Sequence, residues 1–235
     1  MRAVDYLLIA TVAGLAAVER KGFLQAMLSR PVALAPLIGL VLGDLPGGLL
    51  LGPPLELLWL GAVNMGAALP PHEALGAAAI AGGAVLAGRA LGTGVTPPVA
   101  VLAVALVAAL APLGRSTDRL IEEWNVRLAS RAEALVERNA PRAAMRANLY
   151  GLALPFAVSF VLAPVGAALA AWLVPTALRH WPAASAPLAV AWAALGGFAA
   201  AAGARAFRAQ RGLGLFASAT ALTAVLGGLL VGAWP

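Results

Sequence analysis

The sequence predicts an all-α, polytopic membrane protein with about six to eight spans, including broken or re-entrant helices in its N-terminal half. Of the 235 residues, 62% are hydrophobic and only 11% are charged, whereas soluble domains carry about 25% charged residues. At about 20 residues per span, the chain length accounts for the expected number of crossings. Three runs without a charged residue, each long enough to cross a bilayer, lie in the C-terminal half: Ala147–Leu178, Trp181–Ala204 and Gly212–Pro235.

The composition excludes several classes of site. The chain has no cysteine, so it has no disulfide scaffold, no thiolate metal site and no thiolate phosphocarrier. Its two histidines do not favour a histidine metal cage, and we expect no metal and no cofactor. Of the 16 basic residues only Lys21 is not an arginine, and the arginines lie between apolar runs. This pattern is typical of positive-inside topology and of contact with anionic headgroups, and we expect no nucleic-acid partner.

Residues 1–114 are predicted to form a membrane region whose helices are interrupted by glycine and proline. The apolar runs here have about ten to fifteen residues, too few for an ordinary span, and single ionisable residues such as Asp44 and Glu56 separate some of them. They are either full spans with embedded polar residues or half-helices and re-entrant hairpins. Paired broken helices point to a transport site. Asp5 and the lack of a clear cleavage site favour a retained first span over a cleaved signal peptide.

Residues 115–146 form the one long polar stretch, in which arginines alternate with acidic residues while apolar residues recur at helical spacing. Ser116 is suited to cap the start of this helix, and Pro141 is expected to end or bend it. Two interpretations remain open. The segment is either an amphipathic helix lying on the cytoplasmic membrane face or a connecting helix that packs on the chain itself.

The distribution of arginines predicts the topology of the C-terminal region, residues 147–235, which should contain three transmembrane spans. If residues 115–146 are cytoplasmic, the run Ala147–Leu178 crosses to the outside and the run Trp181–Ala204 crosses back to the cytoplasm. Arg205–Arg211 is then cytoplasmic, as its three arginines favour, and the third run ends outside. The side of the N-terminus is not determined by this pattern.

Glu56 is the leading candidate for a functional residue because it is embedded in apolar sequence. A charge at the bilayer centre costs about 2.5–3.5 kcal/mol on insertion scales, so it needs a partner, a cavity or a proton. Asn64 follows eight residues later and would share a face with Glu56 on a continuous helix. A carboxylate and an amide together supply the acceptors and donors that sugar hydroxyls need. The alternative is that both residues make hydrogen bonds between helices.

Two further polar positions have strong local explanations. Asp44 lies in a Gly-Asp-x-Pro-Gly turn, where aspartate commonly bonds to its own backbone. His72 and Glu73 follow Pro70-Pro71, and capping of the next helix explains them well. Trp59 is more typical of a packing or interfacial residue than of a sugar-stacking platform.

The stretch from Arg30 to Leu75 resembles the membrane-embedded IIC subunit of the mannose-type (mannose–fructose–sorbose) phosphotransferase system. The resemblance is carried by Arg30-Pro31, Gly39-Leu-Val-Leu-Gly-Asp44, Leu55-Glu56, Leu60-Gly-Ala-Val-Asn64-Met-Gly-Ala-Ala68, Pro71 and Ala74-Leu75. It implies a sugar-translocating subunit in the bacterial inner membrane that works with a second membrane subunit, IID, and with cytoplasmic IIA and IIB phosphocarriers in an oligomeric complex. The sugar would then be phosphorylated by IIB.

The resemblance also implies that Glu56 and Asn64 line the sugar site. His72 stands where the family tends to have aspartate, and Ala62 stands where an aromatic residue is expected, so both positions bear on which sugar fits. The candidate substrate-binding residues are therefore Glu56, Asn64, His72 and Asp44.

Other classes of function are less well supported. A substrate-binding membrane component of another transporter, or a divergent regulatory homologue that does not transport, remains an alternative. An intramembrane enzyme needs a catalytic constellation, yet the sequence has no Gly-x-Ser-x-Gly, no His-Glu-x-x-His and no P-loop motif. We therefore expect no catalytic residue in this chain.

Overall fold

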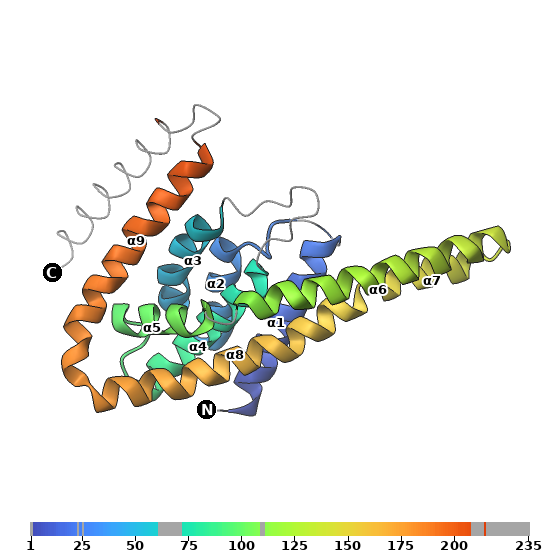
Figure 1. The fold of residues 1–235 in the computed structure, drawn as a ribbon. Coiled ribbons are helices and arrows are strands. Elements are labelled where there is room, and N and C mark those ends of the chain that lie inside the picture. The colour runs from blue at the N-terminus through green and yellow to red at the C-terminus, as the bar shows by residue number, and fades with distance from the viewer. Residues whose placement is uncertain are drawn as a thin grey trace.

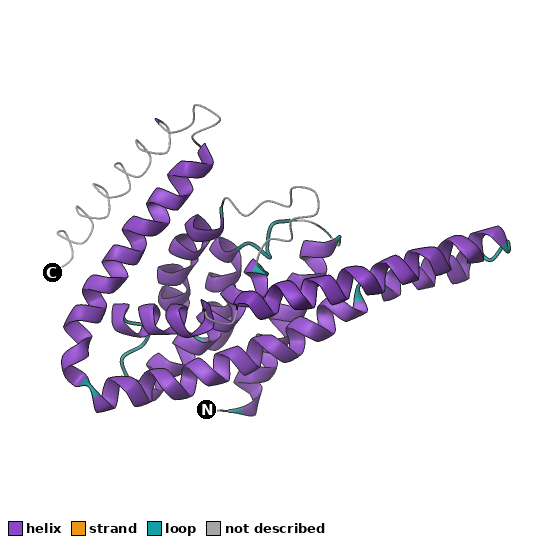
Figure 2. Cartoon of the chain, in the orientation of Figure 1, coloured by secondary structure: helices purple, strands orange, loops and turns teal. Residues whose placement is uncertain are grey.

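The structure is a computed structural model of the chain, and it describes residues 2–22, 24, 26–60, 72–108, 111–207 and 214. Within these residues the regular structure is entirely helical (Figure 2), which confirms the predicted fold class. Three helical segments are long and apolar enough to cross a membrane: Glu73–Leu91, Pro141–His180 and Pro182–Arg205. The run Gly212–Pro235 lies almost wholly outside the described residues.

Two short helices form the N-terminal hairpin that the glycine and proline clusters predicted. Helix α2 (Pro31–Leu42) has 12 residues and α3 (Leu45–Trp59) has 15, so both are shorter than an ordinary span. The turn between them needs Gly43, whose φ is 81°. The helices also approach closely, because a Cβ on Gly48 would lie 2.5 Å from the Ala35 carbonyl oxygen. The rest of the predicted broken segment, beyond Leu60, lies outside the described residues.

Helix α4 (Glu73–Leu91) lies at the centre of the molecule and is buried along almost its whole length. It packs against α1 (Ala3–Lys21), α2, α5 (Pro97–Ala108) and α8 (Ala153–His180). Small residues permit this approach, since a Cβ on Gly83 would lie 2.6 Å from the Ala170 Cβ. Helices in a bilayer associate through such close contacts, because lipid chains are as apolar as the helices themselves.

The polar stretch folds as a helical hairpin instead of a single helix. Helix α6 (Ala111–Glu137) ends before a turn in which Asn139 has a φ of 52°. Helix α7 (Pro141–Tyr150) then begins at Pro141, which cannot continue a preceding helix. The two helices pack together and project away from the body (Figure 1). Both interpretations of this segment, on the membrane face or packed on the chain, stay predictions.

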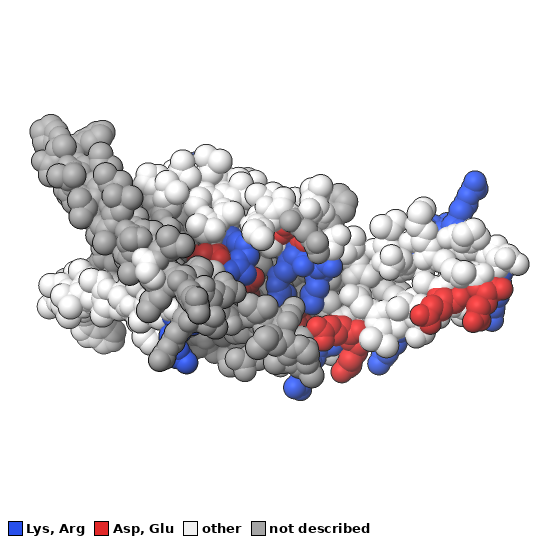
Figure 3. All heavy atoms as spheres, turned by 90° about the horizontal axis from the view of Figure 1, so that it is seen from above, with Lys and Arg blue, Asp and Glu red and all other residues white. Residues whose placement is uncertain are grey.

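The chain returns to the body through α8, the short 3₁₀ helix η1 (Pro182–Ala184) and α9 (Ser185–Phe207). Helix α9 packs against α3 and α5. In Figure 3, charged side chains gather in a central patch and along the projecting hairpin, and a few basic side chains lie at the lower edge of the view.

Ion pairs tie both ends of α1 to other helices. Near its start, Asp5 accepts a hydrogen bond of 3.0 Å from Arg89 of α4. At its end, Arg20 and Lys21 each lie 3.3 Å from Asp118 of α6. Asp118 is only 1% exposed, so these ion pairs fix the base of the projecting hairpin to the body.

Candidate functional site

Glu56 lies in a cluster with Arg30 and Glu73, which joins α3, the start of α2 and the start of α4. Arg30, the residue before α2, donates to Glu56 Oε1 through Nε at 2.9 Å and to Glu73 Oε1 through Nη1 at 3.0 Å. A second nitrogen of Arg30 also bonds to Glu56 Oε1. Glu56 Oε2 accepts a hydrogen bond from the Val32 backbone N–H at 3.3 Å. The partner that an embedded glutamate requires is therefore Arg30.

Glu73 contributes a second carboxylate to this cluster, and sequence reasoning assigned it only a capping role. It is 8% exposed, and its Oε2 atom is buried without a hydrogen-bond partner among the described residues. Arg30 bonds to both carboxylates, but its single positive charge balances only one of them. Glu73 Oε2 is left as an acceptor without a donor among the described residues. Glu73 interrupts apolar sequence as Glu56 does, and that was the available signal, but its pairing with Arg30 across 43 residues is visible only in the fold.

His72 caps α4, as the local explanation predicted. Its Nδ1 accepts a hydrogen bond from the Leu75 N–H at 3.1 Å, which requires a neutral ring with the proton on Nε2. Burial lowers the pKa of His72 to about 4, and the neighbouring charge of Arg20 acts in the same direction. The imidazole is therefore uncharged at neutral pH.

Asp44 lies away from the cluster. Its two carboxylate oxygens accept hydrogen bonds from the Gly47 N–H at 2.9 Å and the Val95 N–H at 3.3 Å. It caps α3 and ties that helix to the segment before α5. Twelve residues of helix separate Asp44 from Glu56, about 18 Å at 1.5 Å per residue. One monosaccharide bound at Glu56 would not reach Asp44.

Asn64, the fourth candidate, lies outside the described residues. The helix that carries Glu56 ends at Trp59. Asn64 therefore does not continue the face of α3 that carries Glu56, and its role in the site stays a prediction. Among the residues that the structure does describe, no group of three or more His, Asp or Glu side chains is arranged to hold a metal ion.

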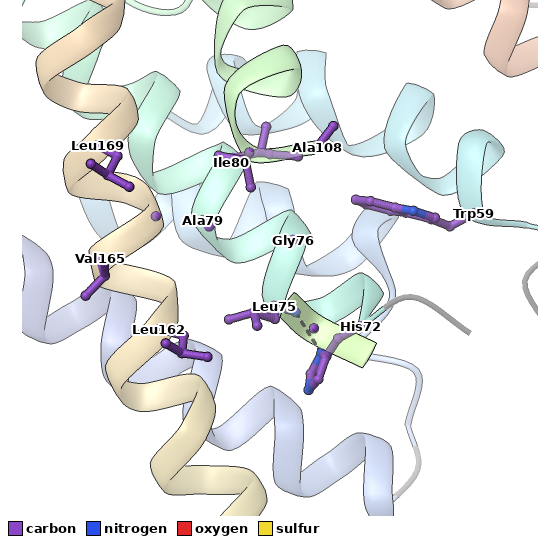
Figure 4. Close-up of a pocket in the computed structure, with 13 residues that line it drawn as sticks. Trp59, His72, Leu75, Gly76, Ala79, Ile80, Ala108, Leu162, Val165 and Leu169 are labelled. Atoms are coloured by element: carbon purple, nitrogen blue, oxygen red, sulfur yellow. Dashed lines mark hydrogen bonds between the residues drawn. The ribbon is translucent and has the colours of Figure 1, made fainter. Parts of the chain in front are cut away.

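A cavity of about 210 Å³ lies between α4 and α8 (Figure 4). Trp59 and His72 line one end of it, and the remaining described lining residues are aliphatic residues and glycines of α4, α5, α6 and α8. A polyhydroxylated sugar would lose its hydrogen bonds to water there without replacement. The polar cluster and the apolar cavity are therefore two different sites.

Comparison with known proteins establishes the family. A family model described as the sorbose-specific IIC component of the PTS (phosphotransferase) system matches residues 3–205. The chain belongs to this family. The mannose-type IIC resemblance of the Arg30–Leu75 stretch is thereby confirmed.

Several curated relatives are permease components of the same kind. A protein named "Putative N-acetylgalactosamine permease IIC component 2" in Escherichia coli strain K12 is 50% identical over 72 residues, which are 31% of this chain and 50% of that protein. The fructose permease IIC component of Bacillus subtilis is 37% identical over 97 residues, 41% of this chain and 35% of that protein. The matches thus span half or less of the length of these relatives.

Two solved structures share the fold over nearly the whole chain. A chain from the complex of the mannose transporter ManYZ with microcin E492 has a TM-score of 0.57 and 23% identity, and the match covers 98% of this chain and 94% of that one. A second structure, described only as a membrane protein, has a TM-score of 0.68 and 20% identity and is matched over 98% of its length. Family and fold together identify this chain as a membrane protein.

Proposed function

We propose that this chain is the sugar-translocating IIC subunit of a phosphoenolpyruvate-dependent phosphotransferase system of the mannose family. It would lie in the bacterial inner membrane with multiple spans and move a hexose-like sugar inward. The observation that carries the proposal is the cluster of Arg30, Glu56 and Glu73 in a chain of the IIC family.

The cluster supplies the chemistry that a sugar needs. Carboxylate oxygens accept hydrogen bonds from sugar hydroxyls, and a guanidinium donates to hydroxyl oxygens. Hydrogen bonds to ionised groups contribute about 1.5–3 kcal/mol each, more than bonds between neutral groups. Glu73 Oε2, which has no partner among the described residues, provides a further acceptor in the same place. Asn64 would add an amide to this set.

The proposal assigns the phosphoryl chemistry to partners. The chain has no cysteine, and His72 is buried, neutral and engaged in a helix cap. A IID-like membrane subunit would complete the pathway, and IIA-like and IIB-like cytoplasmic carriers would deliver the phosphoryl group to the sugar. We propose that this chain itself has no catalytic residue.

Sugar affinity measured on two matched variants tests this proposal. Glu56→Gln removes a carboxylate from the cluster, whereas Glu19→Gln removes another buried carboxylate, which accepts from the Ser29 N–H at 2.9 Å. In the complex with the IID-like subunit, Glu56→Gln should weaken sugar binding, and Glu19→Gln should lower only the melting temperature. Equal affinities with lowered stability in both variants would mean that Glu56 only joins helices.

Asn64→Ala provides a second test of the same site. Loss of one partner from a buried polar site costs about 1–3 kcal/mol, which corresponds to a roughly 5- to 150-fold weaker affinity. Asn148→Ala on α7 is the matched control, because Asn148 is exposed on the hairpin and should leave affinity unchanged. A transport assay separates this system from another class of transporter. In a phosphotransferase system, sugar should accumulate as its phosphate only when phosphoenolpyruvate and the carriers are present.

A further inference from the structure

The apolar cavity is a candidate binding site that the sugar-transport proposal does not use. Its walls come mainly from α4, α5 and α8, and Figure 4 shows side chains of α8 on one side facing side chains of α4 on the other. Apolar cavities of this order of size stay dry and take up apolar guests. The part of any ligand that enters this cavity must therefore be apolar.

The cavity opens toward the surface of the molecule between α5 and α8. Val165 and Leu169 line it and are 52% and 42% exposed, and the lining residue Ala108 at the end of α5 is also exposed. Val165 and Leu169 lie near the middle of α8, within a segment long and apolar enough to cross a membrane. The opening therefore faces the hydrocarbon core of the bilayer and not water.

The occupant available at this depth is a lipid chain. We propose that the cavity binds the terminal part of a phospholipid acyl chain, which enters from the bilayer beside Val165 and Leu169. An acyl chain that moves from the bilayer into the cavity does not leave water, so the hydrophobic effect adds nothing to its affinity. The affinity comes from van der Waals contact with the lining residues. An empty cavity leaves its lining atoms without partners on one side, and a flexible chain restores those dispersion contacts.

The inserted chain would touch the helices that hold the ion cluster. Trp59 lies one turn after Glu56 on α3, and His72 directly precedes Glu73. The Trp59 ring also packs on α4, since a Cβ on Gly76 would lie 3.0 Å from its Cη2 atom. The lipid site and the polar cluster thus share the end of α3 and the start of α4, although the lipid proposal does not depend on sugar binding.

Photolabelling tests the proposal directly. The full chain is placed in bilayer nanodiscs of phosphatidylethanolamine and phosphatidylglycerol that contain a phospholipid with a diazirine at the end of one acyl chain. After irradiation, peptides are mapped by mass spectrometry. We expect adducts on Ala79 and Ile80, which line the cavity and are 3% and 1% exposed, because only a chain inside the cavity reaches them.

Two valines on α8 provide a matched pair of variants. Val165→Trp narrows the opening and should abolish the adducts on Ala79 and Ile80. Val161 lies one turn earlier, is 56% exposed against 52% for Val165, and does not line the cavity, so Val161→Trp should leave the adducts unchanged. Ala108→Phe narrows the opening from the α5 side and replaces Val165→Trp if that variant does not fold.

Three results would overturn the lipid assignment. The first is wild-type labelling confined to the exposed face of α8, which would mean that the cavity holds no lipid. The second is equal labelling of Ala79 and Ile80 in the two tryptophan variants. The third is loss of these adducts when the IID-like subunit is present, which would show that a partner side chain fills the cavity.

Discussion

Arg30 and Glu56 are joined by two hydrogen bonds between the start of α2 and the last turns of α3, with Arg30 Nε 2.9 Å from Glu56 Oε1. The same guanidinium reaches Glu73 at 3.0 Å. Because one side chain holds three helices, its replacement should affect both stability and the polar site.

We expect Arg30→Gln to be among the most destabilising single changes in the chain. It leaves Glu56 and Glu73 without their shared cation. Removal of one partner from a buried ion pair costs about 3–5 kcal/mol, and the partial exposure of Arg30 and Glu56 places the expected loss at or below the lower end of that range. Arg30→Lys keeps the charge but cannot bridge both carboxylates, so its loss should be smaller. Thermal unfolding in a bilayer mimetic measures both. Arg179→Gln, which removes an exposed hydrogen bond to the Ala90 carbonyl, is the control and should change the melting temperature little.

His72 predicts a loss of stability on acidification. Its folded-state pKa of about 4 lies below the ordinary value of 6.5, so the unfolded chain takes up a proton that the folded chain refuses. The resulting penalty is absent above pH 6.5, grows as the pH falls toward 4 and reaches about 3 kcal/mol. His72 precedes the candidate span Glu73–Leu91, and Arg20, Lys21 and Asp118 are the charges that act on it.

The variant His72→Asn isolates this titration, because asparagine retains the cap of α4 without an imidazole. Its melting temperature should fall less than that of the wild type between pH 6.5 and 4. His180→Asn removes an exposed histidine and should follow the wild-type pH curve. Identical pH curves for His72→Asn and the wild type would contradict the assigned pKa.

The same glycine substitution should affect stability differently at two positions. Gly83→Ala places a Cβ 2.6 Å from the Ala170 Cβ, so α4 and α8 must separate at a cost of about 1–3 kcal/mol. Gly196→Ala in α9 meets nothing within 4 Å, and it should be neutral or stabilise the helix by up to about 1 kcal/mol. Thermal unfolding of the two variants decides this, and a similar loss in both would argue against close packing at Gly83.

The predicted topology can be tested by cysteine labelling, since the chain has no native cysteine. Cysteines that replace Arg127 on the hairpin and Arg205 at the end of α9 should both react from the cytoplasmic side. A cysteine that replaces His180, at the end of α8, should react from the opposite side. Labelling of permeabilised cells serves as the control, because it measures the reactivity of each cysteine from both sides together. Labelling of positions 127 and 205 from opposite sides would show that the positive-inside assignment is wrong.

Sequence alone was enough to predict the class of protein, the two long apolar segments that the structure describes in the C-terminal half, and the need of Glu56 for a partner. These conclusions depend on local quantities, namely the length of charge-free runs and the cost of a charge in apolar sequence. The cap at His72 and the turn at Asp44 were equally predictable, because a cap or a turn bonds to backbone a few residues away. The resemblance between Arg30 and Leu75 depended on a short local motif in the same way.

Which distant residues meet became visible only once the helices were packed. The tertiary structure paired Glu56 with Arg30, brought Glu73 to the same guanidinium, placed Asp44 at the other end of α3 and opened an apolar cavity between α4 and α8. The charge of a side chain and the periodicity of apolar residues indicate that a buried charge needs a partner. They do not give the distance between two helices. That distance follows from how turns such as Gly43 and close contacts such as Gly83 set the packing of whole helices.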